Sequence, residues 1–440
     1  MIFKGMNEKI ALFWFRRDLR IHDNPALFAA LNSGLQVLPV FIFDKGILDK
    51  LHNRKDARVL FIHQELKKLK GLLEERGSSL WVYHGDPEEA FRWFLQQFPG
   101  VQTVFANRDY EPYALERDKR VEQFLNASGI KFQTFRDHVI FEKDEVLKND
   151  GTPYTVYTPY SRKWKERLSG EQLMPFASEQ FPGKLYQTSP YPFPEISQLG
   201  FESSFCSFPG RHIDLPLIEQ YAETRDLPAL KGTSRLGVHL RFGTISIREL
   251  TSAALKHGEV FLNELIWRNF FIQIMAHFPH VVNSPFKKPY GRIEWRNDEH
   301  EFERWCLGET GYPMVDAGMR ELNATGFMHN RVRMVTASFL CKHLLIDWRW
   351  GEAYFAEKLL DFELASNNGN WQWAAGTGCD AAPYFRVFNP ETQQQKFDPD
   401  GMYVRKWVPE AGTPGYAKPM VDHKLARERA LETYKKGLAV

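Results

Sequence analysis

The chain has 440 residues, of which 43% are hydrophobic and 25% charged, and its net charge is only +2. This composition is typical of a globular protein of two or three domains, in which any nucleic-acid site would be a local basic patch. The four cysteines form no Cys-x-x-Cys pair, and no apolar run approaches the ~18 residues that span a bilayer. We therefore expect no disulfide scaffold, no metal site and no membrane span. The N-terminal residues lack a signal-peptide layout, which predicts a cytoplasmic protein, and we expect a monomer.

Short apolar runs alternate with helical patterns over the first third of the chain. The runs IALFWF (10–15) and VLPVFIF (37–43) are rich in β-forming residues, as is usual for buried parallel strands. Further strands are expected at SLWVYHG, VQTVFA and IKFQTF, and helices at about 26–34, 59–73, 87–98 and 114–128. This alternation predicts a doubly wound parallel α/β domain over residues 1–135, with helices on both faces of the sheet.

The composition and periodicity of the sequence change twice after residue 135. Pro, Ser, Gly and Tyr recur without periodicity, which indicates a long connector over 136–215. Strand signals then vanish and helical patterns take over, including a long one at 316–345, so we expect an all-helical domain over 216–440. The chain has no GxGxxG and no GxxxxGK[ST] motif, so the α/β domain is not an obvious dinucleotide or nucleoside-triphosphate site.

Two segments of the helical part carry polar groups that suit a ligand. GTSRLG places Thr233 and Ser234 before a helix, where hydroxyl and N–H groups can hold a phosphate, although a simple helix N-cap also explains them. ELIWRNFF places Glu264, Trp267 and Arg268 on one helical face. A carboxylate beside an aromatic ring can bind and stack on a nucleobase. The plain alternative is a Glu264–Arg268 surface ion pair beside a core tryptophan.

Two further segments are unusual for a helical core. In GFMHNRVRM, Asn330, Arg333 and Met334 share one helical face, and an Asn in mid-helix favours a buried polar partner. In LLDFELASNNGNWQWAAGTGCD, we expect a helix to end at Ser-Asn-Asn-Gly, before Trp371 and Trp373. The small residues that follow would let a large planar group approach the backbone closely. The carboxylates and amides of this segment are denser than packing alone requires.

Together and in this order, these segments closely resemble the photolyase/cryptochrome family, and most strongly its class I cyclobutane pyrimidine dimer photolyases. The resemblance begins at WFRRDLRIHDNPAL, recurs in YAETRDLPALKGTSRLG and is nearly continuous over 264–409. It implies an antenna domain, a connector and a helical domain that holds FAD in a U-shaped form. It also implies a flavoprotein lyase that uses blue light to split cyclobutane pyrimidine dimers in UV-damaged DNA.

The resemblance assigns the FAD site to particular residues. Asn367 matches the residue that faces the flavin N5, where the photolyases carry Asn and plant and animal cryptochromes carry Asp or Cys. A neutral amide can hydrogen-bond the flavin without delivering a proton, which suits a reduced, anionic flavin. Arg333 matches the arginine that pairs with an aspartate, here Asp361. The expected cofactor-binding set is Tyr221, Thr233, Ser234, Arg235, Leu236, Gly237, Arg268, Asn330, Arg333, Asp361, Phe362, Glu363 and Asn367.

The pocket for the pyrimidine dimer corresponds, by the same resemblance, to Glu264, Trp267, Asn330, Met334 and Trp373. Enzymes that repair (6-4) photoproducts carry two histidines where this chain has Asn330 and Met334, and neither of these can donate a proton as His does. DASH cryptochromes typically carry Gln and Tyr in place of Met334 and Trp373. We therefore expect activity on the cyclobutane dimer in duplex DNA. The expected DNA contacts further include Arg225, Arg268, Phe271, Arg331, Arg386 and Lys396.

Trp305, Trp348 and Trp371 match the family's electron-transfer triad, which carries electrons from the protein surface to the flavin. The matching motifs are RWCLGETGYP, IDWRWGE and NNGNWQW. Core packing alone would also account for three tryptophans in a chain with 14% aromatic residues. With Glu264 and Asn367, these tryptophans complete the residues expected to act in catalysis.

The antenna domain departs from one family pattern. Folate-binding members carry an Asn-Glu pair where this chain reads Tyr113-Ala114, within NRDYEPYALERD. This argues against a methenyltetrahydrofolate antenna and favours a deazaflavin-like second chromophore, with another flavin or an empty pocket as alternatives.

The implied mechanism begins when the dimer flips out of the duplex, which costs less than flipping normal bases because a lesion pairs poorly. We expect Trp267 and Trp373 to stack on it while Glu264 and Asn330 hydrogen-bond its edges, and the protein to be nucleoid-associated while bound. The main alternative is a blue-light receptor without repair activity. A more remote one is a flavin-dependent redox protein that works in the dark.

Overall fold

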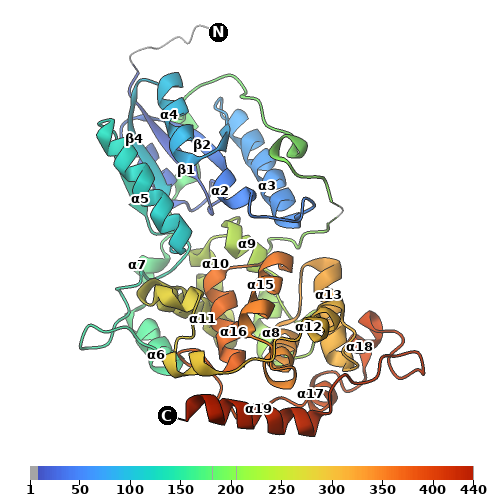
Figure 1. Cartoon of the computed structure of the whole chain (residues 1–440). Coiled ribbons are helices and arrows are strands. Elements are labelled where there is room, and N and C mark those ends of the chain that lie inside the picture. The colour runs from blue at the N-terminus through green and yellow to red at the C-terminus, as the bar shows by residue number, and fades with distance from the viewer. Residues whose placement is uncertain (1–7, 181, 205, 440) are drawn as a thin grey trace. The chain divides into compact units, whose positions relative to one another are not determined.

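The computed structural model describes residues 8–180, 182–204 and 206–439, and the chain divides into two compact units (Figure 1). The first unit takes its residues from Met1–Glu142, Ser169–His212 and Val238–Ser252, and the second takes the rest. The segment 136–215 therefore contributes to both units. It also contains regular structure, in helices α6 (Tyr157–Arg167) and α7 (Gly170–Leu173) and three short 3₁₀ turns.

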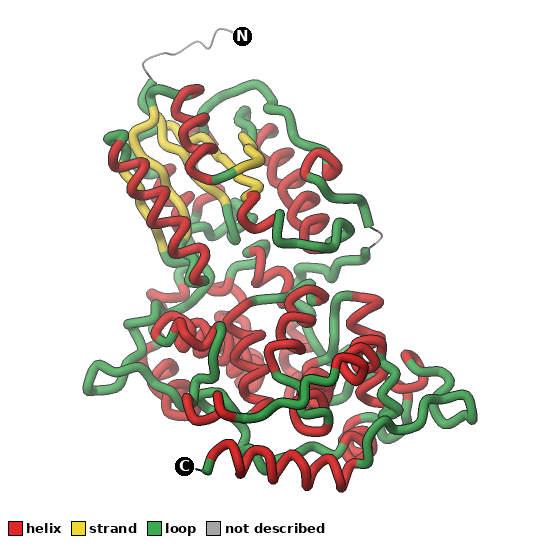
Figure 2. Tube along the Cα trace, viewed as in Figure 1, coloured by secondary structure: helices red, strands yellow, loops and turns green. Residues whose placement is uncertain are grey.

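The first unit is built on a sheet of five parallel strands, as the alternation of the sequence predicted (Figure 2). The strands are β1 (Ile10–Phe15), β2 (Gln36–Asp44), β3 (Trp81–Gly85), β4 (Val101–Asn107) and β5 (Lys131–Phe135). The helices between them are α1 (Pro25–Leu31), α2 (Lys45–Leu48), α3 (Ala57–Glu74), α4 (Pro87–Gln97) and α5 (Pro112–Ala127). The strand order β3-β2-β1-β4-β5 confirms the predicted doubly wound topology.

The core of the first unit follows from the alternation of side chains along its strands. Leu12, Trp14 and Val40 share one face of the sheet, where they pack in one cluster with Phe91 and Phe94 of α4. The strand order reverses between β1 and β4. The carboxyl ends of the strands at such a reversal are where open α/β sheets bind ligands.

The second unit is helical, as predicted, and its described residues hold no strand, only an isolated bridge between Leu147 and Pro153. Two helices, α9 (Gly237–Phe242) and α10 (Ile247–His257), lie where the chain passes between the units. The other helices are α8 (Leu215–Thr224), α11 (Glu259–His277), α12 (Glu299–Leu307), α13 (Pro313–Thr325), α14 (Asn330–Ser338), α15 (Trp348–Lys358), α16 (Leu364–Ala375), α17 (Pro390–Phe397), α18 (Met402–Trp407) and α19 (His423–Leu438). In the described part of the chain, no helix is both long and apolar enough to cross a bilayer.

The long helix expected over 316–345 is interrupted, which corrects that prediction. α13 ends at Thr325, because Gly326 after it has a left-handed φ of 67°, and α14 begins at Asn330. A turn of π-helix (Phe339–His343) then follows α14. Asn330 is thus the first residue of a helix, where Asn is well tolerated, so the prediction of a mid-helix Asn was wrong.

The helix expected to end at Ser-Asn-Asn-Gly continues instead, because α16 runs through these residues to Ala375. The buried amide of Asn368 donates to the backbone oxygen of Val281 at 3.0 Å, so this Asn finds its partner outside the helix rather than ending it. Gly369 leaves room for the ring of Phe271, because a Cβ there would lie 2.1 Å from Phe271 Cδ1. α16 therefore carries Asn367, Trp371 and Trp373 on one continuous helix.

Candidate functional site

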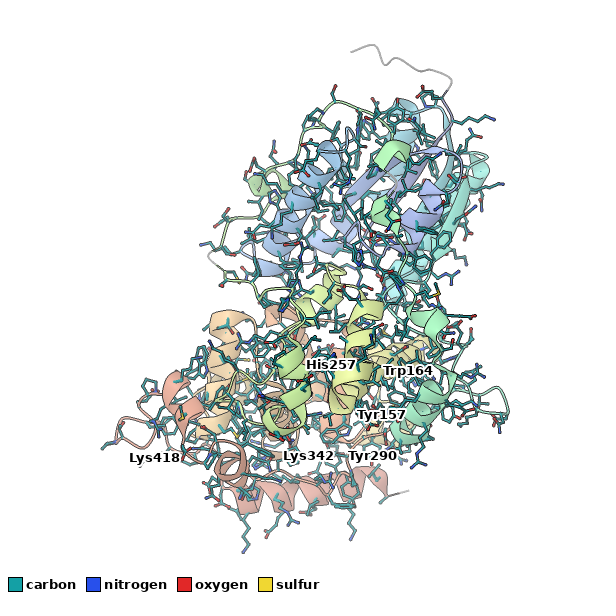
Figure 3. All side chains as sticks on the ribbon, turned by 180° about the vertical axis from the view of Figure 1, so that it is seen from behind. Tyr157, Trp164, His257, Tyr290, Lys342 and Lys418 are labelled. Atoms are coloured by element: carbon teal, nitrogen blue, oxygen red, sulfur yellow. The ribbon has the colours of Figure 1, made fainter. Side chains whose placement is uncertain are left out.

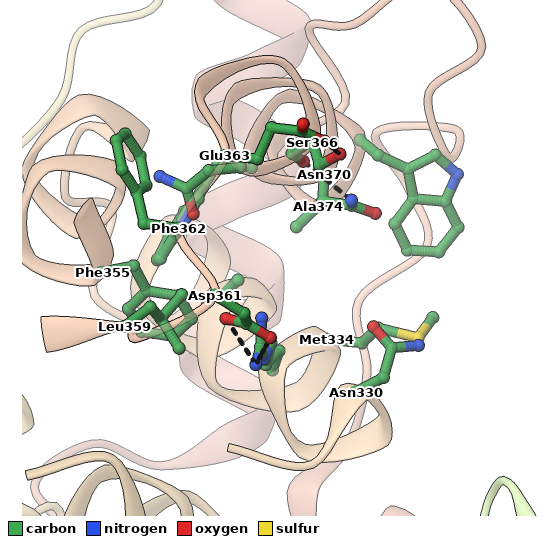
Figure 4. A pocket seen from close by; sticks show the side chains of 15 residues that line it. Asn330, Met334, Phe355, Leu359, Asp361, Phe362, Glu363, Ser366, Asn370 and Ala374 are labelled. Carbon is green, nitrogen blue, oxygen red and sulfur yellow. Dashed lines mark hydrogen bonds and ion pairs between the residues drawn. The ribbon is translucent and has the colours of Figure 1, made fainter. Parts of the chain in front are cut away.

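A cavity of about 590 Å³ lies in the second unit between α14, α16 and the segment that joins α15 to α16 (Figure 4). We call it the helical cavity. Residues that the sequence placed in the cofactor site, in the dimer pocket or in the tryptophan triad line it together: Asn330, Arg333, Met334, Asp361, Phe362, Glu363, Asn367, Trp371 and Trp373. Asn330 and Met334 lie side by side on one wall. Its lining combines flat rings with amide, carboxylate and guanidinium groups, which suits an organic ligand that has both flat and polar parts.

An ion pair forms one wall of the helical cavity. Arg333 Nη2 donates to Asp361 at 2.9 Å, and Arg333 Nε donates to the backbone oxygen of Met328 at 2.7 Å. The last glycine of GTSRLG lies against this pair, because a Cβ on Gly237 would come within 2.8 Å of Asp361 Cβ. The expected Arg333–Asp361 pair is therefore present, and the close approach of Gly237 brings the GTSRLG segment next to it.

The rest of the GTSRLG region has its own local contacts. Arg235 has a left-handed φ of 54°, and its guanidinium lies 4.2 Å from the centre of the Phe327 ring. Ser234 Oγ accepts from the N–H of Leu236 at 3.4 Å, while Thr233 is half-buried. Tyr221 on α8 meets Phe261 edge-on, with ring centres 5.1 Å apart. Among the described residues, this long bond is the only one that the Ser234 and Thr233 hydroxyl groups make, so both can bind a ligand.

Asn367 is held by a residue that the sequence reasoning missed. Its Nδ2 donates both to the backbone oxygen of Glu352 at 3.0 Å and to Glu352 Oε1 at 2.8 Å. Burial raises the pKa of Glu352, while the hydrogen bond from Asn367 lowers it. Glu352 lies on α15 and is the last residue of the motif IDWRWGE, but no local pattern in the sequence indicates that its carboxylate reaches α16.

The charged residues of α11 are paired differently from the simple expectation. Arg268 donates to Glu363 Oε1 at 2.8 Å; the Glu363 side chain is buried and that of Arg268 is half-buried. Glu264 instead forms an ion pair with Arg225 on a neighbouring segment. Burial raises the pKa of Glu264, and Arg225 counteracts this shift by favouring the carboxylate. The alternative of a Glu264–Arg268 surface pair is therefore wrong.

The remaining expected DNA contacts differ in exposure. Arg331 donates to Asp226 at 2.9 Å and lies 4.1 Å from the Phe397 ring centre, so it is already engaged. Arg386 and Lys396 are exposed. Glu264 and Trp267 lie outside the lining of the helical cavity, as far as the described residues show it.

The three expected triad tryptophans are all buried in one hydrophobic cluster. Trp371 meets Trp305 edge-on, with ring centres 6.2 Å apart. Trp305 has no exposed surface, however, and Trp348 has 1%, so none of the three can be the surface end of an electron path. This corrects the expectation that the triad reaches the surface. Trp295 and Trp350 pack against the same cluster and are partly exposed, so they are the candidates for that end.

A second cavity, of about 870 Å³, lies in the first unit at the carboxyl ends of β1 and β2. We call it the sheet cavity. Tyr113 and Ala114, the pair that replaces the folate-binding pattern, line it. Tyr113 Oη donates to Asp44 at 2.9 Å, and the guanidinium of Arg117 lies 5.0 Å from the centre of the Trp14 ring. Burial raises the pKa of the Asp44 carboxyl.

No group of three or more potential metal ligands occurs among the residues that the structure describes. The model of the FAD binding domain of DNA photolyase matches residues 261–413, and that of DNA photolyase matches residues 11–181. The chain is 37% identical to the deoxyribodipyrimidine photo-lyase of Halobacterium salinarum, over 97% of this chain and 99% of that one.

Two solved structures resemble the whole chain. A class III photolyase from Agrobacterium tumefaciens is 36% identical with a TM-score of 0.88, and the match covers 99% of each chain. A photolyase from Sulfolobus tokodaii, solved with two FAD molecules, is 34% identical with a TM-score of 0.82, over 97% of this chain and 99% of that one.

Proposed function

Because the chain belongs to the DNA photolyase family of FAD-binding DNA-repair enzymes, we propose that it uses light to split cyclobutane pyrimidine dimers. One observation carries the substrate assignment. Asn330 and Met334 lie side by side on the wall of the helical cavity, which Trp373 also lines. This wall offers an amide, a thioether and a flat ring, and its Asn330 and Met334 cannot act as proton donors in the way a histidine can.

The helical cavity fits a flavin. Gly237 permits backbone approach next to the Arg333–Asp361 pair, and Asn367 presents a neutral amide to the cavity. Arg333, Asp361 and Asn367 would hold the isoalloxazine, and the GTSRLG segment would hold the phosphates and ribose. FAD supplies the absorption of blue light and the electron that opens the cyclobutane ring.

The protein's own residues would bind and orient the lesion. Trp373 offers a ring on which an extruded pyrimidine can stack, and Asn330 can donate to and accept from its edge. The Glu264 side chain, which is paired with Arg225, would hydrogen-bond the lesion as well. By the family resemblance, Glu264 acts on the lesion after it has gained an electron, so loss of Glu264 should reduce repair more than binding.

The test is a comparison of lesions. The reduced protein receives duplex DNA with either a cyclobutane dimer or a (6-4) photoproduct, is illuminated with blue light, and restored thymines are counted by chromatography. Restoration from the cyclobutane lesion alone, and only under light, supports the proposal. Efficient (6-4) repair overturns the substrate assignment, while no repair of either lesion favours a signalling receptor.

We also propose that the sheet cavity binds a second, light-collecting chromophore of deazaflavin or flavin type. The cavity lies near the reversal of strand order and has Tyr113-Ala114 where folate-binding members carry Asn-Glu. Its walls combine aromatic rings with Arg117, which suits a flat, polar tricycle. The chromophore released by mild denaturation is identified by its absorbance spectrum and mass, and a folate would contradict this proposal.

A further inference from the structure

The ring of Tyr157, the first residue of α6 (Figure 3), lies flat against the indole of Trp267 on α11. The ring centres are 3.6 Å apart and the planes differ by only 4°. Phe270 meets the same indole edge-on at 5.6 Å. One face of Trp267 is therefore covered by a parallel aromatic ring.

Tyr157 is held at both of its ends. Its backbone N–H donates to Asp380 Oδ2 at 2.9 Å, and its hydroxyl donates to the backbone oxygen of Asn263 at 2.9 Å. Farther along α6, Trp164 Nε1 donates to Asn269 Oδ1 at 3.1 Å, so the whole helix is docked on α11 (Figure 3). A ring tethered in this way is a fixed part of the scaffold and not a gate that swings aside.

We propose that Tyr157 is a positioning residue for lesion recognition, which holds the Trp267 ring in one plane so that its opposite face can stack on an extruded pyrimidine. The proposal rests on the function proposed above. Stacking requires parallel planes. Without Tyr157 the indole would keep only its contacts with Phe270, edge-on, and with Phe271, whose ring centre is 5.4 Å away and tilted by 30°, and neither ring lies parallel to it. Tyr157 fixes the plane of the indole before DNA arrives, so less conformational entropy is lost on binding.

The experiment compares Tyr157→Leu, which removes the flat ring, with Tyr157→Phe, which keeps it and loses only the hydroxyl tether. Tyr154→Leu is the matched control, because it is the same change three residues earlier in the chain. Dissociation constants for duplexes with and without a cyclobutane dimer are measured in the dark on the FAD-loaded protein. FAD content and the repair rate at saturating lesion are measured on the same samples.

We expect Tyr157→Leu to weaken lesion binding about 5- to 20-fold, part of the effect of losing a stacking ring. The affinity for undamaged DNA, the FAD content and the repair rate at saturating lesion should stay as in the wild type. The variant should therefore have a higher KM for the lesion and an unchanged kcat. Tyr157→Phe and Tyr154→Leu should behave as the wild type. If Tyr157→Leu does not fold, Tyr157→Met fills the space without a flat face and takes its place.

A double mutant separates positioning from general destabilisation. Adding Tyr157→Leu to Trp267→Ala should cost no further lesion affinity, because Tyr157 acts only through Trp267. Additive losses, wild-type lesion binding by Tyr157→Leu, or tighter binding by it would each overturn the proposal. A wild-type protein without any preference for the lesion would instead show that the proposed function itself had failed.

Discussion

Both amide hydrogens of Asn367 are donated to Glu352, one to its backbone oxygen at 3.0 Å and one to its Oε1 at 2.8 Å. This arrangement fixes which way the amide of Asn367 is turned, because Glu352 offers only acceptors to it. The oxygen of Asn367 is the end of the amide left for the helical cavity, which this residue lines. In the proposed flavin site, Asn367 would therefore accept a hydrogen bond without delivering a proton.

We expect Asn367→Asp to shorten the lifetime of the reduced flavin. The new carboxyl would face Glu352, whose pKa burial already raises, and two carboxyl groups in one site share a proton. The site would then hold a proton donor beside the reduced flavin. Oxidation of the reduced flavin should become about tenfold faster, which corresponds to a loss of stabilisation worth one pKa unit. The measurement is flavin absorbance in air in the dark after photoreduction. Asn323→Asp on the surface of α13 should keep the wild-type lifetime, and an unchanged lifetime in Asn367→Asp would refute the role of Asn367.

The tryptophan cluster gives a second prediction. Trp371→Phe should abolish photoreduction with an added reductant while FAD stays bound, because the ring nearest the flavin by family resemblance is lost. Since Trp305 is fully buried, a partly exposed tryptophan must complete the path to solvent. We expect Trp295→Phe or Trp350→Phe to slow photoreduction, with Trp93→Phe in the first unit as the control. The rate of flavin bleaching under blue light is measured for all four variants. Normal photoreduction in Trp371→Phe would show that Trp371 is not part of the electron path.

The sequence predicted the sheet better than the site, and particular residues show why. β1 lies at the residues where IALFWF placed it, because a run that is buried on both faces must be apolar throughout. The break before Asn330 was missed, because Gly326 reads as a tolerated helical glycine until its left-handed φ is seen. The contacts of Asn367 with Glu352, and of Trp267 with Tyr157, join separate helices and leave no periodic signal. A sequence motif also does not tell how far a side chain lies from solvent. Trp305 therefore matched the triad motif although its side chain is fully buried.

The Arg225–Glu264 ion pair predicts a pH dependence of repair. Burial raises the pKa of Glu264 and Arg225 opposes the shift, so Arg225→Met should raise that pKa further. The carboxylate would then be lost at a higher pH than in the wild type, and repair at saturating lesion should fall earlier as the pH is lowered. Glu264→Gln should repair slowly at every pH, with lesion binding less affected. Identical pH profiles for the wild type and Arg225→Met would show that the charge of Glu264 does not matter.

Acid stability should depend on His343 in the π-helical turn. Burial, with His423 and Arg429 nearby, lowers the pKa of His343 to about 3. The unfolded chain has the ordinary value of about 6.5, so between these two values it binds a proton that the folded protein excludes. The free energy of unfolding should therefore fall as the pH drops through this window, by up to about 1.4 kcal/mol per pH unit. Urea unfolding at several pH values measures the slope. His343→Gln should flatten it, and an equal slope in this variant would contradict the assignment.

Lesion preference and general DNA affinity should separate between the cavity and the surface. Trp373 lines the helical cavity, whereas Arg386 and Lys396 are exposed. Trp373→Ala should cost about 1–3 kcal/mol of lesion binding, because a stacking ring is lost, and should leave undamaged DNA and the salt dependence unchanged. Arg386→Ala and Lys396→Ala should weaken both duplexes equally and lower the slope of log affinity against log salt by about 1 each, because each cation releases a counterion from a phosphate. Binding titrations at several salt concentrations distinguish the two patterns. If Trp373→Ala kept full lesion preference, the stacking site would lie elsewhere on the helical unit. If Arg386→Ala and Lys396→Ala weakened only lesion binding, these side chains would contact the extruded bases and not the phosphates.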